Sequence, residues 1–180
     1  LTACAGIAIV KTAYPFHAAH ELAESLCESA KEARSHGDVV SSVLFHRVTT
    51  ASAETRWDAI KASELTAPNG LLSGGPYTLG ALGDLEVLAK ALDTWPRKAV
   101  RGWLELTRSD PERADAYWKR AKEVADRDQR TRFDAALTAL QHDIDTGFVN
   151  GERTALADAL LWQSLQPRPK SDGRLRVSNL

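Results

Sequence analysis

The stretch Ala5-Gly6-Ile7-Ala8-Ile9-Val10 is an unbroken run of small and branched apolar residues close to the start of the chain. A short apolar run of this kind predicts a strand that is buried on both faces, as strands are in the middle of an α/β sheet. The run ends at Lys11. The turn Tyr14-Pro15-Phe16 then breaks the pattern, because proline disfavours a helical conformation in the residue before it. Residues 1–12 are therefore predicted to form a central strand.

Residues 16–35 have the pattern of an amphipathic helix. Their alanines and leucines recur at helical spacing and form one stripe, whereas the glutamates and Lys31 lie mostly outside that stripe. Gly37 is placed to close the helix in a left-handed conformation. Residues 39–50 are rich in valine, serine and threonine, which predicts a second strand. The first fifty residues therefore indicate a β-α-β unit.

The rest of the chain begins with a polar segment and continues with a series of predicted helices. Residues 51–70 predict a polar excursion with one helical turn near Trp57, and residues 74–79 predict a turn that leads into a short strand. From Leu82 onward, apolar residues recur at helical spacing in several successive segments. We predict an α+β fold in three parts: an α/β portion over residues 1–94, a helical domain over residues 95–166, and a flexible tail over residues 167–180.

The composition narrows the classes of function. The 180 residues include 43% hydrophobic and 26% charged residues, which is ordinary for a globular protein. A formal net charge of −1 argues against sequence-independent nucleic-acid binding, which needs a dense positive field, although a local patch is still allowed. No apolar run approaches the roughly 20 residues of a membrane span. We therefore expect no membrane association.

The two cysteines, Cys4 and Cys27, fit small buried residues better than a zinc site or a disulfide framework. This usage favours a reducing compartment, and we expect a cytoplasmic protein. The sequence contains no methionine and starts at Leu1, inside a strand-like segment. That start predicts a processed or partial piece of a longer product.

The first third of the chain resembles a known family. The strand Thr2-Ala3-Cys4-Ala5-Gly6-Ile7-Ala8-Ile9-Val10-Lys11, the Tyr14-Pro15-Phe16 turn and the alanine- and leucine-rich helix that ends in Ala30-Lys31 carry the resemblance. Together they resemble the second palm domain of the large subunit of type III CRISPR interference complexes. Gly75-Pro76-Tyr77-Thr78 resembles a Pro-Tyr-Thr segment of that family, and the helical half is similar to the domain that follows the palm.

The resemblance implies a ferredoxin-like α+β palm, related to the GGDEF-type cyclases, in which the Ile7 strand lies between antiparallel partners. It also implies a role in antiviral defence: the joining of ATP into cyclic oligoadenylates by two-metal phosphoryl transfer, a nucleotidyltransferase chemistry that uses Mg²⁺ or Mn²⁺. The implied partners are ATP, other subunits of the effector complex, and guide and target RNA.

One motif of the family is missing from this chain. The metal-binding Gly-Gly-Asp-Asp hairpin does not occur in the sequence, and Cys4 stands where the family usually has serine. In the family, the hairpin precedes the Ala-Gly-Ile-Ala-Ile strand. We therefore assign no catalytic residue and no metal ligand to this chain, and any bound metal would be held by residues outside it.

Three residues are candidates for nucleotide binding. The resemblance implies that Lys31, near the end of its helix, contacts the nucleotide phosphates, and a lysine is a compact charge that suits a triphosphate. The alternative for Lys31 is a solvated side chain favoured by the helix dipole and by Glu28 three residues back. Lys11, just after the strand, could point at a ligand or lie in solvent. Gly6 could allow close approach of a base or ribose, or tight packing against the helix.

Two other groups of polar residues are weaker candidates for a metal site or a catalytic site. His17 and His20 have a spacing that can chelate a metal, but no third ligand has a fitting spacing, and helix-surface histidines explain them better. Asp143 and Asp145 alternate along the chain, and a solvated surface explains them.

A different functional class is also consistent with the sequence. The chain would then be a non-enzymatic scaffold that docks a partner through its tryptophan-rich helices, and a large exposed apolar patch there would favour this. Trp95, Trp103 and Trp118 are expected to anchor helix packing. A third interpretation is an α+β domain whose family resemblance is coincidental.

Overall fold

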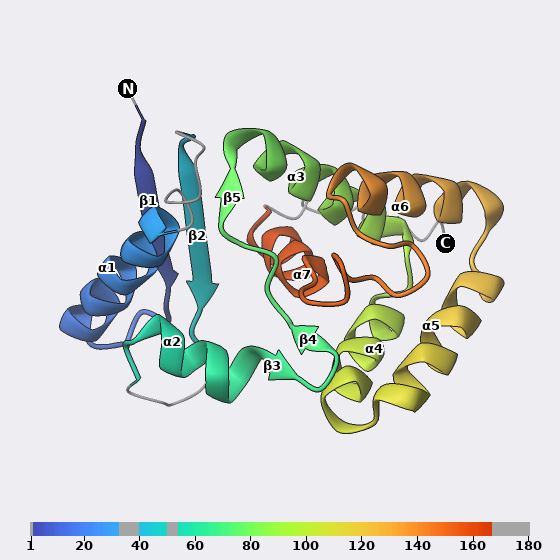
Figure 1. The fold of residues 1–180 in the computed structure, drawn as a ribbon, viewed down its shortest axis with the longest axis horizontal. Helices are drawn as coiled ribbons and strands as arrows, with labels where there is room; N and C mark the ends of the chain where they lie inside the picture. The colour runs from blue at the N-terminus through green and yellow to red at the C-terminus, as the bar shows by residue number, and fades with distance from the viewer. Residues whose placement is uncertain (1, 33–39, 50–53, 167–180) are drawn as a thin grey trace, which may run out of the picture.

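The computed structural model describes residues 2–32, 40–49 and 54–166 (Figure 1). Its elements, in chain order, are β1 (Cys4–Ile9), α1 (Phe16–Glu32), β2 (Ser42–Arg47), α2 (Trp57–Ile60), the π-helical turn η2 (Lys61–Leu65), β3 (Thr66–Ala67), β4 (Gly70–Leu71), β5 (Tyr77–Thr78), α3 (Leu79–Thr94), α4 (Arg97–Ser109), α5 (Pro111–Val124), α6 (Arg127–Ala139) and α7 (Leu156–Leu165). The chain is thus an α+β protein, with its sheet in the first half and its longer helices mainly in the second.

The main sheet has three strands in the order β1-β2-β5. β1 and β2 run parallel, with Cys4 opposite Ser42 and Ile9 opposite Arg47. β5 runs antiparallel to β2, with Val43 opposite Tyr77. The parallel pair is joined by α1, which is the crossover connection that parallel neighbours require.

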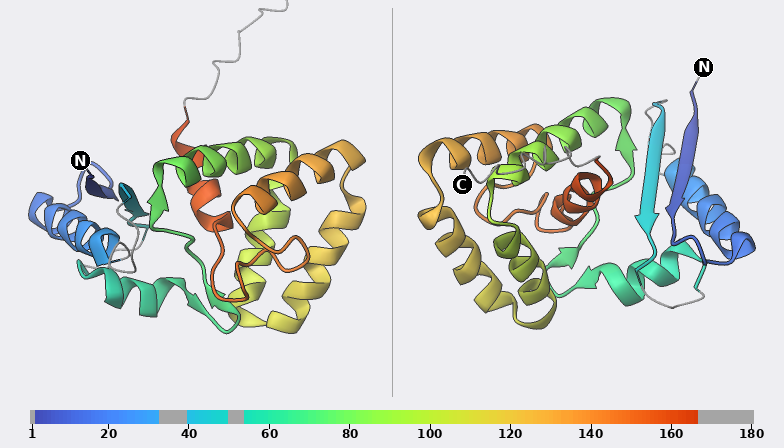
Figure 2. Two further views of the ribbon diagram at one scale, coloured as in Figure 1. Left: turned by 45° about the horizontal axis from the view of Figure 1, so that its top comes forward. Right: turned by 180° about the vertical axis from the view of Figure 1, so that it is seen from behind.

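The helix α1 covers one face of the sheet, and the helical half covers part of the other (Figures 1 and 2). The core under α1 is formed by buried residues of the helix, of β2 with Val48 after it, and of α2: Leu22, Leu26, Ala30, Leu44, Val48, Trp57 and Ile60. Gly6 lets β1 and α1 approach closely, because a Cβ at this position would lie within 3.0 Å of three atoms of α1.

The structure corrects the prediction that the first strand is central and buried on both faces. β1 lies at the edge of the described sheet, where Ala5 is exposed and Ile7 is 47% exposed. The helices of the second half pack over β2 and β5, and their core reaches β1 only at Ile9. The single described neighbour of β1 is parallel, so the pair of antiparallel partners expected for a palm is not present among the described residues.

The helical half is built around α7. This helix packs against α3, which in turn packs against α6, and α4 packs against α5. Their shared core also contains Phe45 of β2 and Tyr77 of β5, so residues on both sides of the predicted boundary near residue 94 belong to one core. Figure 1 shows α7 enclosed between the sheet and the other helices.

Three tryptophans anchor this core, as expected from the sequence. Trp95, Trp103 and Trp118 are each at most 2% exposed. Trp103 stacks obliquely on Trp118 with ring centroids 4.8 Å apart, and Trp118 in turn contacts Phe133 at 5.7 Å. Aromatic packing of this kind adds to the hydrophobic stabilisation of a core.

Most predicted elements agree with the structure. The helical turn near Trp57 is present as α2. One of the helices found after Leu82 is α5, whose N-cap Asp110 accepts a hydrogen bond from the Arg113 amide at 3.1 Å. No helix within the described ranges is long and apolar enough to cross a membrane. Gly37 and the predicted tail over residues 167–180 lie outside the described residues.

Candidate functional site

Lys31 lies in the last turn of α1, with its side chain exposed. The preceding residue is held by the sheet, since the Ala30 carbonyl accepts hydrogen bonds from Ser42 Oγ at 2.9 Å and from Cys4 Sγ at 3.8 Å. No ion pair joins Lys31 to Glu28 within the described part of the chain. Lys31 is therefore an accessible charge on a fixed helix end.

The other two predicted nucleotide-binding residues lie elsewhere. Lys11 is exposed in the loop between β1 and α1, whereas Lys31 ends α1, a helix of 17 residues and thus about 25 Å long. The side-chain position of Gly6 faces α1, so the structure accounts for this glycine by close packing. The three residues do not form one site.

The two histidines on the first turns of α1 do not form a metal centre in the described residues. His17 is exposed, and His20 Nδ1 lies 3.5 Å from a carboxylate oxygen of Glu24. No group of three or more His, Cys, Asp or Glu side chains within residues 2–32, 40–49 and 54–166 could hold a metal ion.

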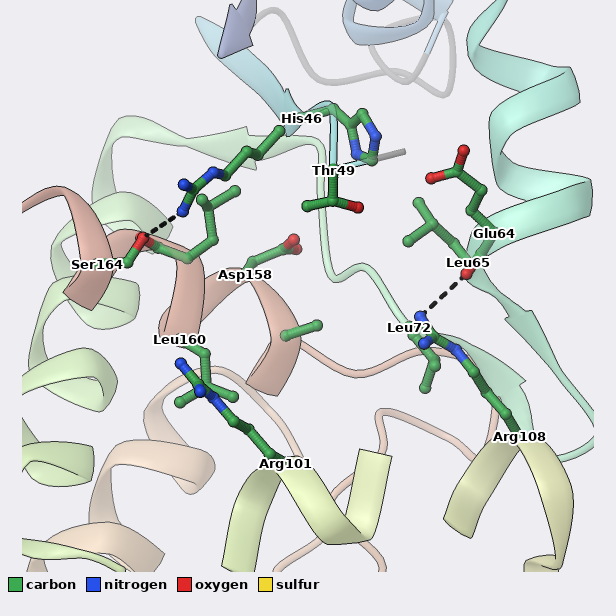
Figure 3. Close-up of a pocket in the computed structure, with 13 residues that line it drawn as sticks. His46, Thr49, Glu64, Leu65, Leu72, Arg101, Arg108, Asp158, Leu160 and Ser164 are labelled. Atoms are coloured by element: carbon green, nitrogen blue, oxygen red, sulfur yellow. Dashed lines mark hydrogen bonds between the residues drawn. The ribbon is translucent and has the colours of Figure 1, made fainter. Parts of the chain in front are cut away.

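A cavity of about 270 Å³ opens where the sheet meets the helical half, and we call it the arginine cleft (Figure 3). Residues from the end of β2, from η2, from α4 and from α7 line it. Three arginines contribute to the lining: Arg47 from β2, and Arg101 and Arg108 from α4. Arg101 and Arg108 are seven residues apart, so two helical turns bring them to the same side of α4.

The arginines of the cleft are held in different ways. Arg47 Nη1 donates to Ser164 Oγ at 3.2 Å, and Arg108 Nη2 donates to the Glu64 carbonyl at 3.0 Å. Both acceptors are neutral. Arg101 is exposed and forms no hydrogen bond or ion pair with any other described residue. The guanidinium groups thus keep their charge without a carboxylate partner in the described structure.

Asp158 lies at the bottom of the cleft and is almost fully buried. Its Oδ2 atom accepts three hydrogen bonds, from Ser73 Oγ at 3.1 Å, the Gly74 amide at 2.8 Å and the Tyr77 hydroxyl at 2.7 Å. We call these residues the Asp158 cluster. A buried carboxylate requires hydrogen-bond donors around it. The donors here come from the segment between β4 and β5 and from β5 itself, so the cluster links α7 to these parts of the chain.

Burial raises the pKa of Asp158 from 3.8 to about 6, although the hydrogen bonds from Tyr77, Gly74 and Ser73 oppose this rise. The same surroundings raise the pKa of Tyr77, through burial and the neighbouring carboxylate. At neutral pH Asp158 is therefore largely ionised inside the protein, at an energetic cost that its donors offset only in part.

This raised pKa predicts a pH-dependent stability. The folded protein holds the Asp158 proton more tightly than the unfolded chain, so its contribution to stability is greatest below pH 3.8 and is lost as the pH rises to about 6. Urea unfolding of the wild type and of Asp158→Asn should show that their difference in unfolding free energy changes by about 3 kcal/mol across this window. A difference that is constant with pH would contradict the prediction.

The start of α7 is positioned by a buried histidine. His142 Nε2 accepts a hydrogen bond from the Ala155 amide at 2.9 Å, and its Nδ1 lies 2.9 Å from the Leu140 carbonyl. This pair of contacts requires a neutral ring with the proton on Nδ1. Burial lowers the pKa of His142, which favours the neutral form. His142 thus holds the helix that carries Asp158.

Sequence reasoning missed the arginine cleft and the Asp158 cluster. Arg47 and Arg101 are 54 residues apart in sequence and line the same cavity only through the tertiary fold. Asp158 carried a signal that could have been used, because it is the only charged residue of the helix Leu156–Leu165 and its neighbours up to Trp162 are all apolar. A single acid in an apolar helix is typically buried with specific hydrogen-bond partners.

No protein-family model matches the sequence, and no curated protein matches it. The function proposed below is therefore argued from the residues of this chain and their positions in the fold.

Proposed function

We propose that this chain is a portion of an antiviral type III CRISPR large subunit, made of part of its ferredoxin-like, nucleotide-binding palm and the helical domain that follows. In this proposal the chain contributes a contact to the phosphates of ATP through Lys31. The metal-binding carboxylates for Mg²⁺ or Mn²⁺ would be supplied by residues outside the sequence, which contains no Gly-Gly-Asp-Asp.

The observation that supports the proposal is the arrangement of the segment that carries the family resemblance. It folds as a strand, a proline-containing turn and a helix, and it ends with Lys31 exposed on a helix terminus that the sheet holds in place. A lysine held in this way can approach a triphosphate as a point charge. Lys11 and Gly6 do not extend this contact, since they lie away from Lys31.

The open edge of β1 leaves room for one antiparallel palm strand, whereas its other edge is already paired with the parallel strand β2. Within the described residues β1 pairs on one side only, and Ala5 and Ile7 are exposed beside the unpaired edge. An exposed apolar edge strand is normally covered by another strand or by a partner. A further palm hairpin that pairs here would cover it and would place an antiparallel neighbour beside the Ile7 strand.

The test of the proposal is a calorimetric titration of the chain with ATP in the presence of Mg²⁺ or Mn²⁺. We expect weak binding that Lys31→Ala reduces by about tenfold, the effect of losing one charge-assisted contact. Lys119→Ala is the matched control, because Lys119 is another exposed helical lysine and lies on α5. No ATP binding, or binding that is equally strong in Lys31→Ala, would contradict the proposal.

The alternative function is a non-enzymatic scaffold that docks another subunit of the complex through the helical half. Exposed apolar side chains on these helices favour it, among them Val87 of α3 and Val124 of α5, which are 52% and 68% exposed. Trp95, Trp103 and Trp118 are buried, so they stabilise the helices rather than contact a partner. An absence of ATP binding in the titration above would favour the scaffold.

A further inference from the structure

We propose that the arginine cleft is a binding site for the phosphate group of a phosphate ester, either a nucleotide or a single-stranded oligonucleotide. The proposal rests on the geometry of the cleft and does not depend on the role of Lys31. Figure 3 shows the side chains of Arg101 and Arg108 extending from α4, with Asp158 and Leu160 on the neighbouring helix α7.

The arrangement of charge supports an anionic ligand. Three arginines line the cleft, and the described structure gives none of them a carboxylate partner. A guanidinium has five N–H donors in a planar fork that matches a phosphate group. Arg101 is the most available of the three, since it forms no hydrogen bond or ion pair with another described residue.

The acidic residues of the cleft cancel only part of this charge. Two carboxylates, those of Glu64 and Asp158, line it beside the three arginines. The Oδ2 atom of Asp158 is directed at its own donors, Ser73, Gly74 and Tyr77, and so is already hydrogen-bonded within the protein. Glu105 lies between Arg101 and Arg108 on α4 but does not line the cavity.

The size and the apolar surface of the cleft favour an ester over a free inorganic ion. Its volume of about 270 Å³ lies just below the range of roughly 300–1,000 Å³ that is usual for small-molecule sites. Three leucines form an apolar wall: Leu65 of η2, Leu72 just after β4, and Leu160 of α7. The cavity can therefore enclose a phosphate and an adjoining sugar, while the rest of the ligand extends into solvent.

The experiment measures the binding of three probes to the full chain: a fluorescein-labelled single-stranded oligoadenylate, ATP and inorganic triphosphate. Binding is measured at low salt, about 50 mM, since phosphate contacts weaken steeply with ionic strength. The variants are Arg101→Gln, Arg108→Gln and Arg101→Lys. Arg130→Gln on α6 is the control, because Arg130 is also exposed and its replacement changes the net charge equally.

We expect Arg101→Gln and Arg108→Gln each to weaken the binding of ATP or oligoadenylate by about tenfold. Arg101→Lys should lose less, and Arg130→Gln should lose less than twofold. In a Lys31→Ala background, which removes the other proposed ATP contact, Arg101→Gln should still cause the loss. Binding of ATP without oligoadenylate would identify a nucleotide as the ligand, and a preference for oligoadenylate would identify a strand. Inorganic triphosphate should compete in both cases.

Two results would overturn the inference. One is no binding of any of the three probes at low salt by the wild type. The other is an equal loss of affinity in Arg101→Gln and Arg130→Gln, which would indicate a general charge effect rather than a site. Arg101 has no hydrogen bond with a described residue, so its replacement is not expected to disturb folding, and circular dichroism would check this.

Discussion

Replacing Gly6 with alanine is expected to separate β1 from α1 and to lower the free energy of unfolding by roughly 4 kcal/mol. The added Cβ would lie within 3.0 Å of the Ala23 carbonyl oxygen, the Cys27 amide nitrogen and Leu26 Cβ. Two of these atoms belong to the backbone of α1 and cannot rotate away. The helix would have to move as a unit, and its contacts through Leu22 and Leu26 would loosen.

Urea unfolding followed by circular dichroism measures this effect. Gly83→Ala is the matched control, because Gly83 lies in α3 and a Cβ added there would meet nothing within 4 Å. The control should become more stable by up to about 1 kcal/mol, since alanine is the better helix former. If Gly6→Ala were as stable as the wild type, the close packing of β1 on α1 would be disproved, and the ligand-approach explanation for Gly6 would regain support.

The second large effect is expected for Asp158→Ala, which should lower the free energy of unfolding by roughly 3–4 kcal/mol near neutral pH. The substitution leaves three donors without their acceptor, and Ser73 and Tyr77 are at most 3% exposed. Each buried donor that loses its partner costs about 1–3 kcal/mol. Two effects make the loss smaller than the sum of these costs. The variant no longer buries a charge, and water can enter from the cleft to bind the donors.

Thermal unfolding of Asp158→Ala, Tyr77→Phe and Asp115→Ala tests this prediction. Tyr77→Phe removes one of the three hydrogen bonds and should cost about 1.5–3 kcal/mol. Asp115 is an exposed aspartate of α5, and its replacement should change stability by no more than about 0.5 kcal/mol. An Asp158→Ala variant as stable as Asp115→Ala would show that the Asp158 cluster does not hold α7 to the sheet.

The local fold could be predicted from the sequence to a large extent, because hydrophobic periodicity and the residues of turns and helix caps are local signals. The apolar run at Ile7, the stripe of α1 and the cap at Asp110 all specify their own elements. The position of β1 in the sheet could not be predicted in this way. A run of apolar residues does not show which faces a neighbouring element will cover, and here the helical half covers β2 but leaves Ile7 exposed.

The sites were less predictable, for a physical reason. Lys31 could be singled out because its place at a helix end is local. The arginine cleft joins residues 47, 101 and 108, whose proximity depends on how α4 and α7 pack against the end of β2. Asp158 and Tyr77 are likewise 81 residues apart in sequence and 2.7 Å apart in space. No spacing rule within one element reports such contacts.

The central place of α7 has a consequence for how the protein is made. The helix that the other elements surround is the last one in the described chain. Its residues Leu156 and Ala159 are fully buried, as is Ala155 just before it. During synthesis on the ribosome, the core between α3 and α6 therefore stays incomplete until the residues of α7 have left the ribosome. Contacts between distant parts of a chain form slowly, so closing the core of the helical half around α7 is expected to be a late step of its folding.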